Sequence, residues 1–208
     1  LSIFSTRLRA PLFGGNLKQL LKTVQVELAK AQQADQLSAD LVISVQEQLK
    51  RIDSLQDDID LLGQRLRIMI RQDRQMQAIE QIPGVGDLTA SALVAAVGDF
   101  TTFKSGRQFA SWVGLVPRQV GTGGKTQQLG ISKRGDTYLR TLLIAGARAV
   151  VTRTEKSCWI TQLLERRHFN VVVVALANKM ARTAWAILAK GVAFDKVKWN
   201  PLETVSAR

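Results

Sequence analysis

An alternating spacing of apolar residues in the first half of the chain limits its fold more than any other feature. The residues concerned step by three and four positions in turn: Ile52, Leu55, Ile59, Leu62, Leu66 and Met69. This spacing places all of them on one face of an α-helix and is typical of a coiled-coil contact stripe. It predicts a long helix from about 39 to 76, interrupted at Asp73, whose stripe needs a partner. That partner is either the helix predicted at 16–34, folded back, or another chain.

The positive charge of the chain is concentrated in its second part. Residues 1–80 hold 11 Lys/Arg and 10 Asp/Glu, whereas residues 81–208 hold 18 and 7 within a total balance of +12. This distribution favours a nucleic-acid partner for the basic part. An anionic membrane surface is disfavoured, because the cations cluster in loops rather than on an amphipathic face. The apolar run at 171–188 contains Lys179 and Arg182 near its middle, so we expect a buried helix and no membrane partner.

A glycine turn follows the long helix at Ile82-Pro83-Gly84-Val85-Gly86. Apolar spacing before it and a small-residue helix after it resemble a helix-hairpin-helix, a clamp for the DNA backbone. Gly84 and Gly86 relieve the tight turn, and the N-terminus of the next helix can offer free N–H groups to a phosphate. A plain helix–helix connection buried in the core is the alternative.

Residues 114–136 show no helical periodicity, and we predict a long functional loop there. Seven Lys/Arg accompany one Asp between 104 and 140, and five glycines lie at 114–130. Thr122 stands between two glycines, with Arg118 and Lys125 nearby. A hydroxyl in this setting could attack a phosphodiester if cations stabilise the developing charge, although such hydroxyls usually bond locally.

The remaining segments are predicted to be helical. Ser105 caps a short helix that Gly114 ends, Asp136 or Thr137 starts a helix to about 151, and further helices follow at 155–167 and 171–188. Arg140 and Arg148 can flank one groove, because eight residues place them about 80° apart on their helix. The fold class is therefore all-α. A helical hairpin or coiled coil (1–77) precedes a compact helical domain (78–191) that contains the helix-hairpin-helix-like motif, and a basic tail (192–208) ends the chain.

Several kinds of chemistry lack the residues that they need. One cysteine, Cys158, excludes an internal disulfide framework, and with no signal-peptide pattern at the N-terminus we expect a cytoplasmic protein. His168 is the only histidine and follows two arginines at a predicted helix end, where we interpret it as a partner of the helix dipole. The carboxylates of the basic part form no paired motif, so we expect no metal site in this chain.

A set of motifs between 82 and 143 resembles the C-terminal transposase domain of the DEDD-type insertion-sequence transposases. This family includes the relatives of the Piv invertase and the bridge-RNA-guided recombinases. The motifs are Ile82-Pro83-Gly84-Val85-Gly86, Phe109-Ala110-Ser111-Trp112-Val113-Gly114-Leu115-Val116-Pro117-Arg118-Gln119, Gly123-Gly124-Lys125 and Ile131-Ser132-Lys133-Arg134-Gly135-Asp136. Leu139, Arg140, Leu142 and Leu143 complete the pattern, and the resemblance extends over about residues 78–190.

The resemblance implies a nucleophilic serine in the loop after the glycine–proline segment, an acidic RuvC-like domain that holds metal ions, and assembly through a coiled coil. Here Thr122 takes the serine's place, with Ser132 as the second candidate. No stretch of this chain matches the acidic domain. We therefore expect a divalent metal only together with such a domain, and weak or no activity from the isolated chain.

The interpretation that we carry forward is a transposase or recombinase portion that binds DNA and supports strand cleavage and exchange through a loop hydroxyl. The alternative is a non-catalytic nucleic-acid-binding or assembly protein derived from a transposase. We expect DNA as the partner, a guide RNA as an optional one, a homo-oligomer formed through the coiled coil, and a location at the bacterial nucleoid. The predicted DNA-binding residues are Gly84, Gly86, Arg118, Lys125, Lys133, Arg134, Arg140 and Arg148.

Overall fold

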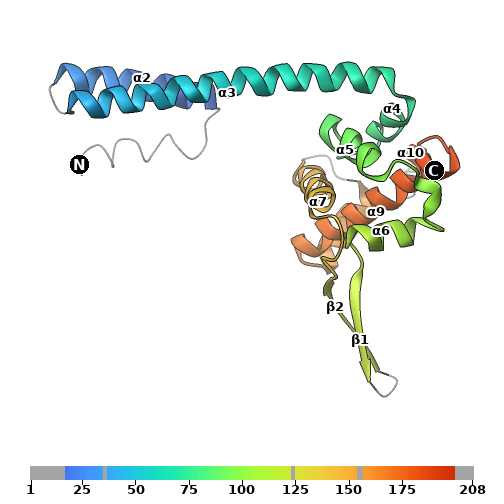
Figure 1. The fold of residues 1–208 in the computed structure, drawn as a ribbon. Helices are drawn as coiled ribbons and strands as arrows, with labels where there is room; N and C mark the ends of the chain where they lie inside the picture. The colour runs from blue at the N-terminus through green and yellow to red at the C-terminus, as the bar shows by residue number, and fades with distance from the viewer. Residues whose placement is uncertain (1–16, 35–36, 123–124, 154–156, 200–208) are drawn as a thin grey trace, which may run out of the picture. The chain divides into compact units, whose positions relative to one another are not determined.

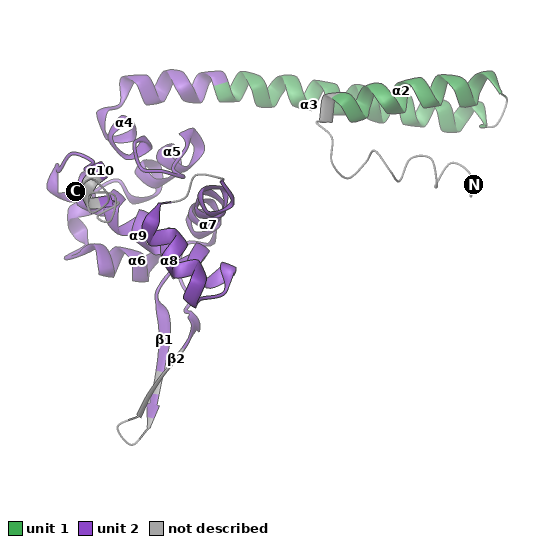
Figure 2. Cartoon of the chain, turned by 180° about the vertical axis from the view of Figure 1, so that it is seen from behind, with its two compact units in different colours: residues 1–63 green, residues 64–208 purple. Residues whose placement is uncertain are grey.

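The computed structural model of the chain describes residues 17–34, 37–122, 125–153 and 157–199 (Figure 1). The chain divides into two compact units, residues 1–63 and 64–208 (Figure 2). The dividing point lies inside one long helix. The domain boundary predicted at residue 77 stays a prediction.

Unit 1 is built on a pair of helices, α2 (Leu17–Gln33) and α3 (Ala39–Gln72). Their shared core consists of buried Leu21, Leu28, Val42 and Leu49, with Val24, Leu37, Val45 and Ile52 packed against it. The segment predicted at 16–34 is therefore a partner for the first part of α3. The coiled-coil stripe beyond Ile52 is exposed in unit 1: Leu55 is 54% exposed, and Ile59 and Leu62 are 60% exposed.

The interruption predicted at Asp73 is confirmed as the boundary between α3 and α4 (Arg74–Glu80). The Asp73 carboxylate accepts hydrogen bonds from the backbone N–H groups of Gln75 at 2.7 Å and Met76 at 3.1 Å. These bonds satisfy two N–H groups that have no partner within the new helix. The long helix therefore ends at Gln72 rather than at 76.

Unit 2 is helical around a central helix, which confirms the all-α fold class. Its elements after α4 are α5 (Asp87–Val97), η1 (Phe100–Thr102), α6 (Gly106–Val113), β1 (Pro117–Thr122), β2 (Lys125–Ile131), α7 (Thr137–Thr152), α8 (Cys158–Arg166), α9 (Phe169–Lys190) and α10 (Lys196–Trp199). Helix α9 packs against α4, η1, α6, α7 and α8 (Figure 1).

By length and composition α9 could cross a membrane, but here it is a core helix. Its buried side chains include Val172, Val173, Leu176, Met180 and Trp185. This burial confirms the expectation of a buried helix at 171–188. The interpretation of His168 as a partner of a helix C-terminus is wrong. Its Nδ1 accepts the Asn170 N–H at 3.3 Å, so it caps the N-terminus of α9, two residues after α8 ends.

The loop predicted at 114–136 is wrong over most of its length, because residues 117–131 form a β-hairpin. Strands β1 and β2 pair antiparallel from Pro117 with Ile131 to Thr122 with Lys125, with an irregularity between 117 and 119. The last described pair of the register is Thr122 with Lys125. A Gly-Gly pair between two short extended runs is a sequence signal for such a hairpin. The hairpin extends away from the helices of unit 2 (Figure 1).

Candidate nucleic-acid interface

The base of the hairpin is a place where two backbone segments touch. Gly114 and Gly135 have positive φ angles of 83° and 103°. A Cβ added to Gly114 would lie 2.2 Å from the carbonyl oxygen of Arg134, and one added to Gly135 would lie 1.7 Å from that of Trp112. Only glycine fits both the conformation and the space. These glycines thus join the segments before and after the hairpin.

Hydrogen bonds fix this base to the helical body. The backbone N–H of Ser132 donates to the Val116 carbonyl at 2.8 Å, and that of Lys133 donates to the Gly114 carbonyl at 3.2 Å. The Asn178 side chain on α9 donates to the Leu115 carbonyl at 3.1 Å. The start of β1 and the end of β2 are therefore held against α9.

A cavity of about 840 Å³, which we call the hairpin-base pocket, lies between this base and α9. Its volume is within the range of ligand-binding pockets. Apolar residues of α9 and of the strand ends form part of its lining, together with polar and cationic side chains. The polar and cationic residues are Arg107, Arg118, Ser132, Lys133, Asn170, Asn178 and Arg182. This composition suits an anionic ligand with some apolar surface.

Two of the predicted DNA-binding residues, Arg118 and Lys133, lie together on this pocket, and both are exposed. Lys133 adopts a positive φ of 55°, which is uncommon for a residue with a side chain. The structure thus brings together cations that are fifteen residues apart in the sequence, because they follow one another across the base of the hairpin.

The second nucleophile candidate, Ser132, also lines the pocket. Its Oγ is buried and has no hydrogen-bond partner among the residues that the structure describes. A buried hydroxyl without a partner is uncommon, since it costs about 1–3 kcal/mol of desolvation. The hydroxyl is therefore placed where an incoming polar group would satisfy it.

The first candidate, Thr122, lies at the other end of the hairpin. Its backbone pairs with Lys125 next to the turn, whereas the side chains of both residues lie outside the described part of the structure. Five residues of strand separate Thr122 from Pro117, which corresponds to about 17 Å at the usual rise. Thr122 and Ser132 therefore belong to different places and cannot serve one site in this conformation.

Arg140 has a structural role rather than a place on the exposed surface. It is only 9% exposed, and its guanidinium donates to the Val113 carbonyl and to the Thr137 hydroxyl, both at 3.1 Å. These bonds tie the start of α7 to the end of α6 beside Gly114. Burial and these two hydrogen bonds weigh against a contact between Arg140 and DNA, which stays a prediction.

The other predicted cations on this side of unit 2 are exposed. Arg148 donates to the Asn170 side chain at 3.2 Å and lies 5.4 Å from the Phe169 ring centre. Asn170 lines the hairpin-base pocket, so Arg148 borders it through this contact. Arg134 is exposed one residue after Lys133. Their predicted contacts to DNA stay predictions.

The glycine turn at 82–86 packs on α7. A Cβ on Gly84 would lie 2.8 Å from the carbonyl oxygen of Gly146, and one on Gly146 would lie 1.9 Å from that of Gly84. The two glycines therefore allow the turn and the helix to touch backbone to backbone. This packing requires glycine at position 84 whether or not the turn binds a phosphate.

The N-terminus of α5 carries acid rather than base. Gly86 is its N-cap and Asp87 lies in its first turn. Burial, together with the hydrogen bond and charge repulsion from Asp87, raises the pKa of the Glu80 carboxyl above its ordinary value. A phosphate at this helix end would meet two carboxylates, which weighs against the helix-hairpin-helix prediction. That prediction for Gly84 and Gly86 remains untested.

Sequence reasoning missed two cations of the pocket, Arg107 and Arg182. Arg107 is in the first turn of α6, and Arg182 enters the sequence argument only as an obstacle to membrane insertion. A sequence signal for Arg182 does exist: a charged residue within a helix that is otherwise buried marks the side on which that helix is open. Arg107 carries no such signal, because only the packing of α6 on α9 places it there.

Within the described residues, no group of three or more His, Cys, Asp or Glu side chains could hold a metal ion. The metal that the resemblance implies, together with an acidic domain, stays an expectation. The groups available in unit 2 are thus cations, amides and hydroxyls, which can bind and orient a phosphate.

Comparison with known proteins identifies the family of the segment that contains most of this candidate interface. Residues 76–162 match the family model described as Transposase IS116/IS110/IS902 family. These residues hold the glycine turn, the β-hairpin and α7. This part of the chain belongs to the IS116/IS110/IS902 transposase family, which confirms the resemblance found in the sequence.

Individual relatives agree with this assignment. The chain is 49% identical over 144 residues to a probable family 20 transposase of Pseudomonas aeruginosa, a match that covers 67% of the chain and 43% of that protein. It is 42% identical over 145 residues to the transposase for insertion sequence element IS1328 of Yersinia enterocolitica, with the same shares covered. A pilin gene-inverting protein of Moraxella bovis is 28% identical over 123 residues, or 55% of the chain and 37% of that protein. The chain spans less than half the length of these relatives.

Proposed function

We propose that this chain acts as part of a DNA transposase and binds DNA through the cations around the hairpin-base pocket. The observation that carries the proposal is the position of Arg118 and Lys133 at this pocket, within the region shared with transposases. Arg107 and Arg182 extend the same positive surface. Cations clustered at a concave surface attract the phosphate backbone without reading its sequence.

A salt titration of duplex DNA binding tests this proposal. Replacing Arg118 and Lys133 together by glutamine should weaken binding by about tenfold or more and reduce the salt slope by about 2, because each phosphate that is no longer neutralised lowers it by about 0.9. The control is Lys50→Gln with Arg51→Gln, which removes the same charge from α3. If the control loses as much affinity, or if binding does not respond to salt, the hairpin-base pocket is not the DNA site.

We further propose Thr122 as the hydroxyl that attacks DNA. The family's serine loop supports this assignment, as does the position of Thr122 at the outer end of a projecting hairpin. A bond would form between Thr122 Oγ1 and phosphorus while one phosphorus–oxygen bond of the DNA backbone breaks. The leaving deoxyribose oxygen would take up a proton and become a free hydroxyl, which balances the proton that the Thr122 hydroxyl loses. The acidic domain that the resemblance implies would supply the metal ions for this step.

Covalent protein–DNA adducts report on the nucleophile. Wild type, Thr122→Ser and Thr122→Ala should be compared with and without an added acidic domain. We expect little adduct from the isolated wild-type chain, more from Thr122→Ser because threonine's methyl group crowds the attack, and none from Thr122→Ala. Adducts that persist in Thr122→Ala but disappear in Ser132→Ala would transfer the role to Ser132.

The second candidate function is non-catalytic binding or assembly. It is favoured by the separation of about 17 Å between Thr122 and the hairpin base, since the cations of the hairpin-base pocket lie at the other end of the strands from that hydroxyl. Intact DNA binding without adducts from any variant, even with an acidic domain present, would select this alternative.

Self-association is part of the proposal. The α3 stripe at Leu55, Ile59 and Leu62 continues the heptad spacing beyond the part that α2 covers, and it is exposed within one chain. Leucine and isoleucine at such positions favour a second helix of the same kind. We assign a second copy of this chain to the stripe. Together with a DNA partner, this assembly would locate to the bacterial nucleoid.

A further inference from the structure

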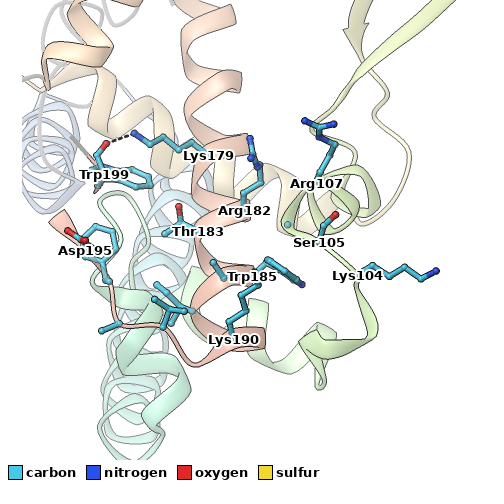
Figure 3. Close-up of a pocket in the computed structure, with 16 residues that line it drawn as sticks. Lys104, Ser105, Arg107, Lys179, Arg182, Thr183, Trp185, Lys190, Asp195 and Trp199 are labelled. Atoms are coloured by element: carbon cyan, nitrogen blue, oxygen red, sulfur yellow. Dashed lines mark hydrogen bonds between the residues drawn. The ribbon is translucent and has the colours of Figure 1, made fainter. Parts of the chain in front are cut away.

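A second cavity, which we call the aromatic pocket, lies over the C-terminal half of α9 (Figure 3). It has a volume of about 890 Å³, and cationic and aromatic side chains form part of its lining. Among them are Lys104, Arg107, Arg182, Trp185, Lys190 and Phe194. In Figure 3 the helix runs between Ser105 and Arg107 on one side and Asp195 and Trp199 on the other. Lys104, Trp185, Lys190 and Phe194 lie outside the hairpin-base pocket that the proposed function uses, whereas Arg107 and Arg182 line both pockets.

The two pockets share one face of α9. The residues on this face recur at intervals of three or four: Val171, Ala175, Asn178, Arg182, Ala186 and Lys190. The first three line the hairpin-base pocket and the last two line the aromatic pocket, while Arg182 and Arg107 line both. Nineteen residues of helix give this face a length of about 28 Å. The pockets therefore adjoin each other at Arg107 and Arg182, and we call the two together the track.

The cations of the track are open to a ligand. Lys104, Arg107, Arg182 and Lys190 are exposed, and they outnumber Asp195, the carboxylate in the described lining of the aromatic pocket. Gly106 brings the two arginines near each other, because a Cβ there would lie 3.1 Å from the Arg182 carbonyl oxygen. An anion along the track would relieve the repulsion between like charges.

The aromatic walls are held in place by contacts within the protein. The Trp185 indole N–H donates to the carbonyls of Phe100 at 3.2 Å and Phe103 at 3.1 Å. The Lys179 ammonium donates to the Trp199 carbonyl and lies 4.5 Å from the centre of the Trp199 ring. Burial lowers the pKa of Lys179 below its ordinary value. Lys179 thus fixes one wall of the pocket, and the Lys190 ammonium lies 5.3 Å from the centre of the Trp185 ring.

We propose that the aromatic pocket binds a single strand of nucleic acid, whose phosphates contact Lys104, Arg182 and Lys190 and whose bases contact Phe194. A track of about 28 Å suits several phosphates in a row rather than one small anion. Apolar and aromatic walls between the cations can contact bases only when those bases are unpaired. The assignment goes beyond the proposed function, because duplex binding at the hairpin-base pocket could fail while this site remains.

The charge component is tested by fluorescence anisotropy with short oligothymidylate, oligouridylate and duplex DNA, each over a range of salt. Replacing Lys104 and Lys190 together by glutamine should weaken single-strand binding by about tenfold and reduce its salt slope by about 1.4, which is about 0.7 for each neutralised phosphate. Duplex binding should stay within about twofold, because these lysines lie outside the hairpin-base pocket. The control Lys50→Gln with Arg51→Gln should leave both unchanged.

The base component is tested with Phe194→Ala. Loss of stacking should weaken single-strand binding by about fivefold without changing the salt slope, since no charge is removed. Tryptophan fluorescence supplies a second readout, because Trp185 and Trp199 line the pocket and a bound base should quench them. Circular dichroism establishes that each variant is folded.

Three results would overturn the proposal: no binding of either single strand, equal loss of duplex and single-strand affinity in the Lys104 and Lys190 variant, or an equal loss in the α3 control. The relative affinity of the thymidylate and uridylate strands distinguishes displaced DNA from RNA as the natural source, and either order supports the site. The Arg118 and Lys133 variant should weaken duplex binding more than single-strand binding, so failure of the two proposals is distinguishable.

Discussion

The two compact units of this chain cover their apolar residues in different ways. Unit 2 surrounds α9 with other helices, and side chains such as Leu93, Phe109 and Leu143 are completely buried. Unit 1 has a narrow core between α2 and α3 and leaves Ile59 and Leu62 mostly exposed. The two units also differ in charge, because the excess of Lys and Arg over Asp and Glu lies in residues 81–208, within unit 2. Unit 2 thus has a well-buried core and an excess of positive charge, whereas unit 1 leaves apolar side chains exposed.

The largest expected effect is on the free energy of unfolding when a glycine is replaced by a residue with a side chain, which unit 2 should tolerate less well than unit 1. Gly146→Val should destabilise unit 2 by about 3 kcal/mol or more, because its Cβ would lie 1.9 Å from the Gly84 carbonyl oxygen and two backbone segments would have to separate. Urea unfolding followed by tryptophan fluorescence reports on unit 2 alone, since all four tryptophans lie there.

The matched change in unit 1 is Gly63→Ala. No atom lies within 4 Å of an added Cβ, and Gly63 is inside α3. We expect a stabilisation of about 0.5–1 kcal/mol from the better helix propensity, measured by urea unfolding followed by circular dichroism, because tryptophan fluorescence does not report on unit 1. If both substitutions cost the same free energy of unfolding, the contrast between the two units is not a contrast in packing.

The next effect concerns self-association. Ile59→Asp combined with Leu62→Asp should raise the dissociation constant of the assembly by about 100-fold or more, because charge would be buried in the helix contact. Sedimentation equilibrium measures this change. Leu61→Asp is the control, since Leu61 is exposed on α3 but lies outside the stripe. A wild-type chain that is already monomeric would refute the prediction.

A smaller effect is expected at the helix that follows the hairpin. Asp136 caps α7, and its carboxylate accepts the Leu139 N–H at 2.9 Å. Asp136→Ala should reduce the stability of unit 2 by about 1 kcal/mol, and Asp136→Asn should retain most of it because asparagine also caps helices. Equal losses in the two variants, measured by chemical unfolding, would show that the charge rather than the cap matters.

The smallest effect is a pH dependence at the turn between α4 and α5. Because the pKa of Glu80 is raised in the folded state, the folded protein holds this proton more tightly, and the associated stability is lost as the pH rises through that pKa. Glu80→Gln should therefore stabilise unit 2 at neutral pH by a few tenths of a kcal/mol, about the size of an exposed like-charge pair. The gain should disappear in acid. A gain that is independent of pH would exclude repulsion from Asp87 as its cause.

The positions of many helix ends can be predicted from the sequence because they depend on a few neighbouring residues. The sequence predicts a helix interruption at Asp73 and helix starts at Ser105 and Asp136, and each side chain accepts a backbone N–H two or three residues later. Gly114 and Gly191 end their helices in the left-handed conformation that glycine adopts easily. The heptad spacing of α3 is a local pattern of the same kind.

The hairpin could not be predicted from the sequence, because the strand pattern of its residues is weak and short. The stretch from Pro117 to Ile131 has little alternation of apolar and polar residues, and its glycines suggest a loop. The pairing of β1 with β2 satisfies backbone groups that a loop would leave to solvent. A two-residue Gly-Gly turn is the main cue for a hairpin, and the nearby cations draw the interpretation toward phosphate binding instead.

By itself, the sequence determined the all-α class, the long helix with its break, the basic second part and the transposase family. Tertiary structure alone decided which cations are exposed to a ligand and which glycines lie where two backbone segments touch. Arg140 is buried against Val113, while Arg107 and Arg182 meet across 75 residues of sequence on the track over α9. Gly84 and Gly146 bring two backbone segments into direct contact. The physical reason is range: caps and helix periodicity act within a few residues, whereas burial and pockets depend on segments that approach one another only after folding.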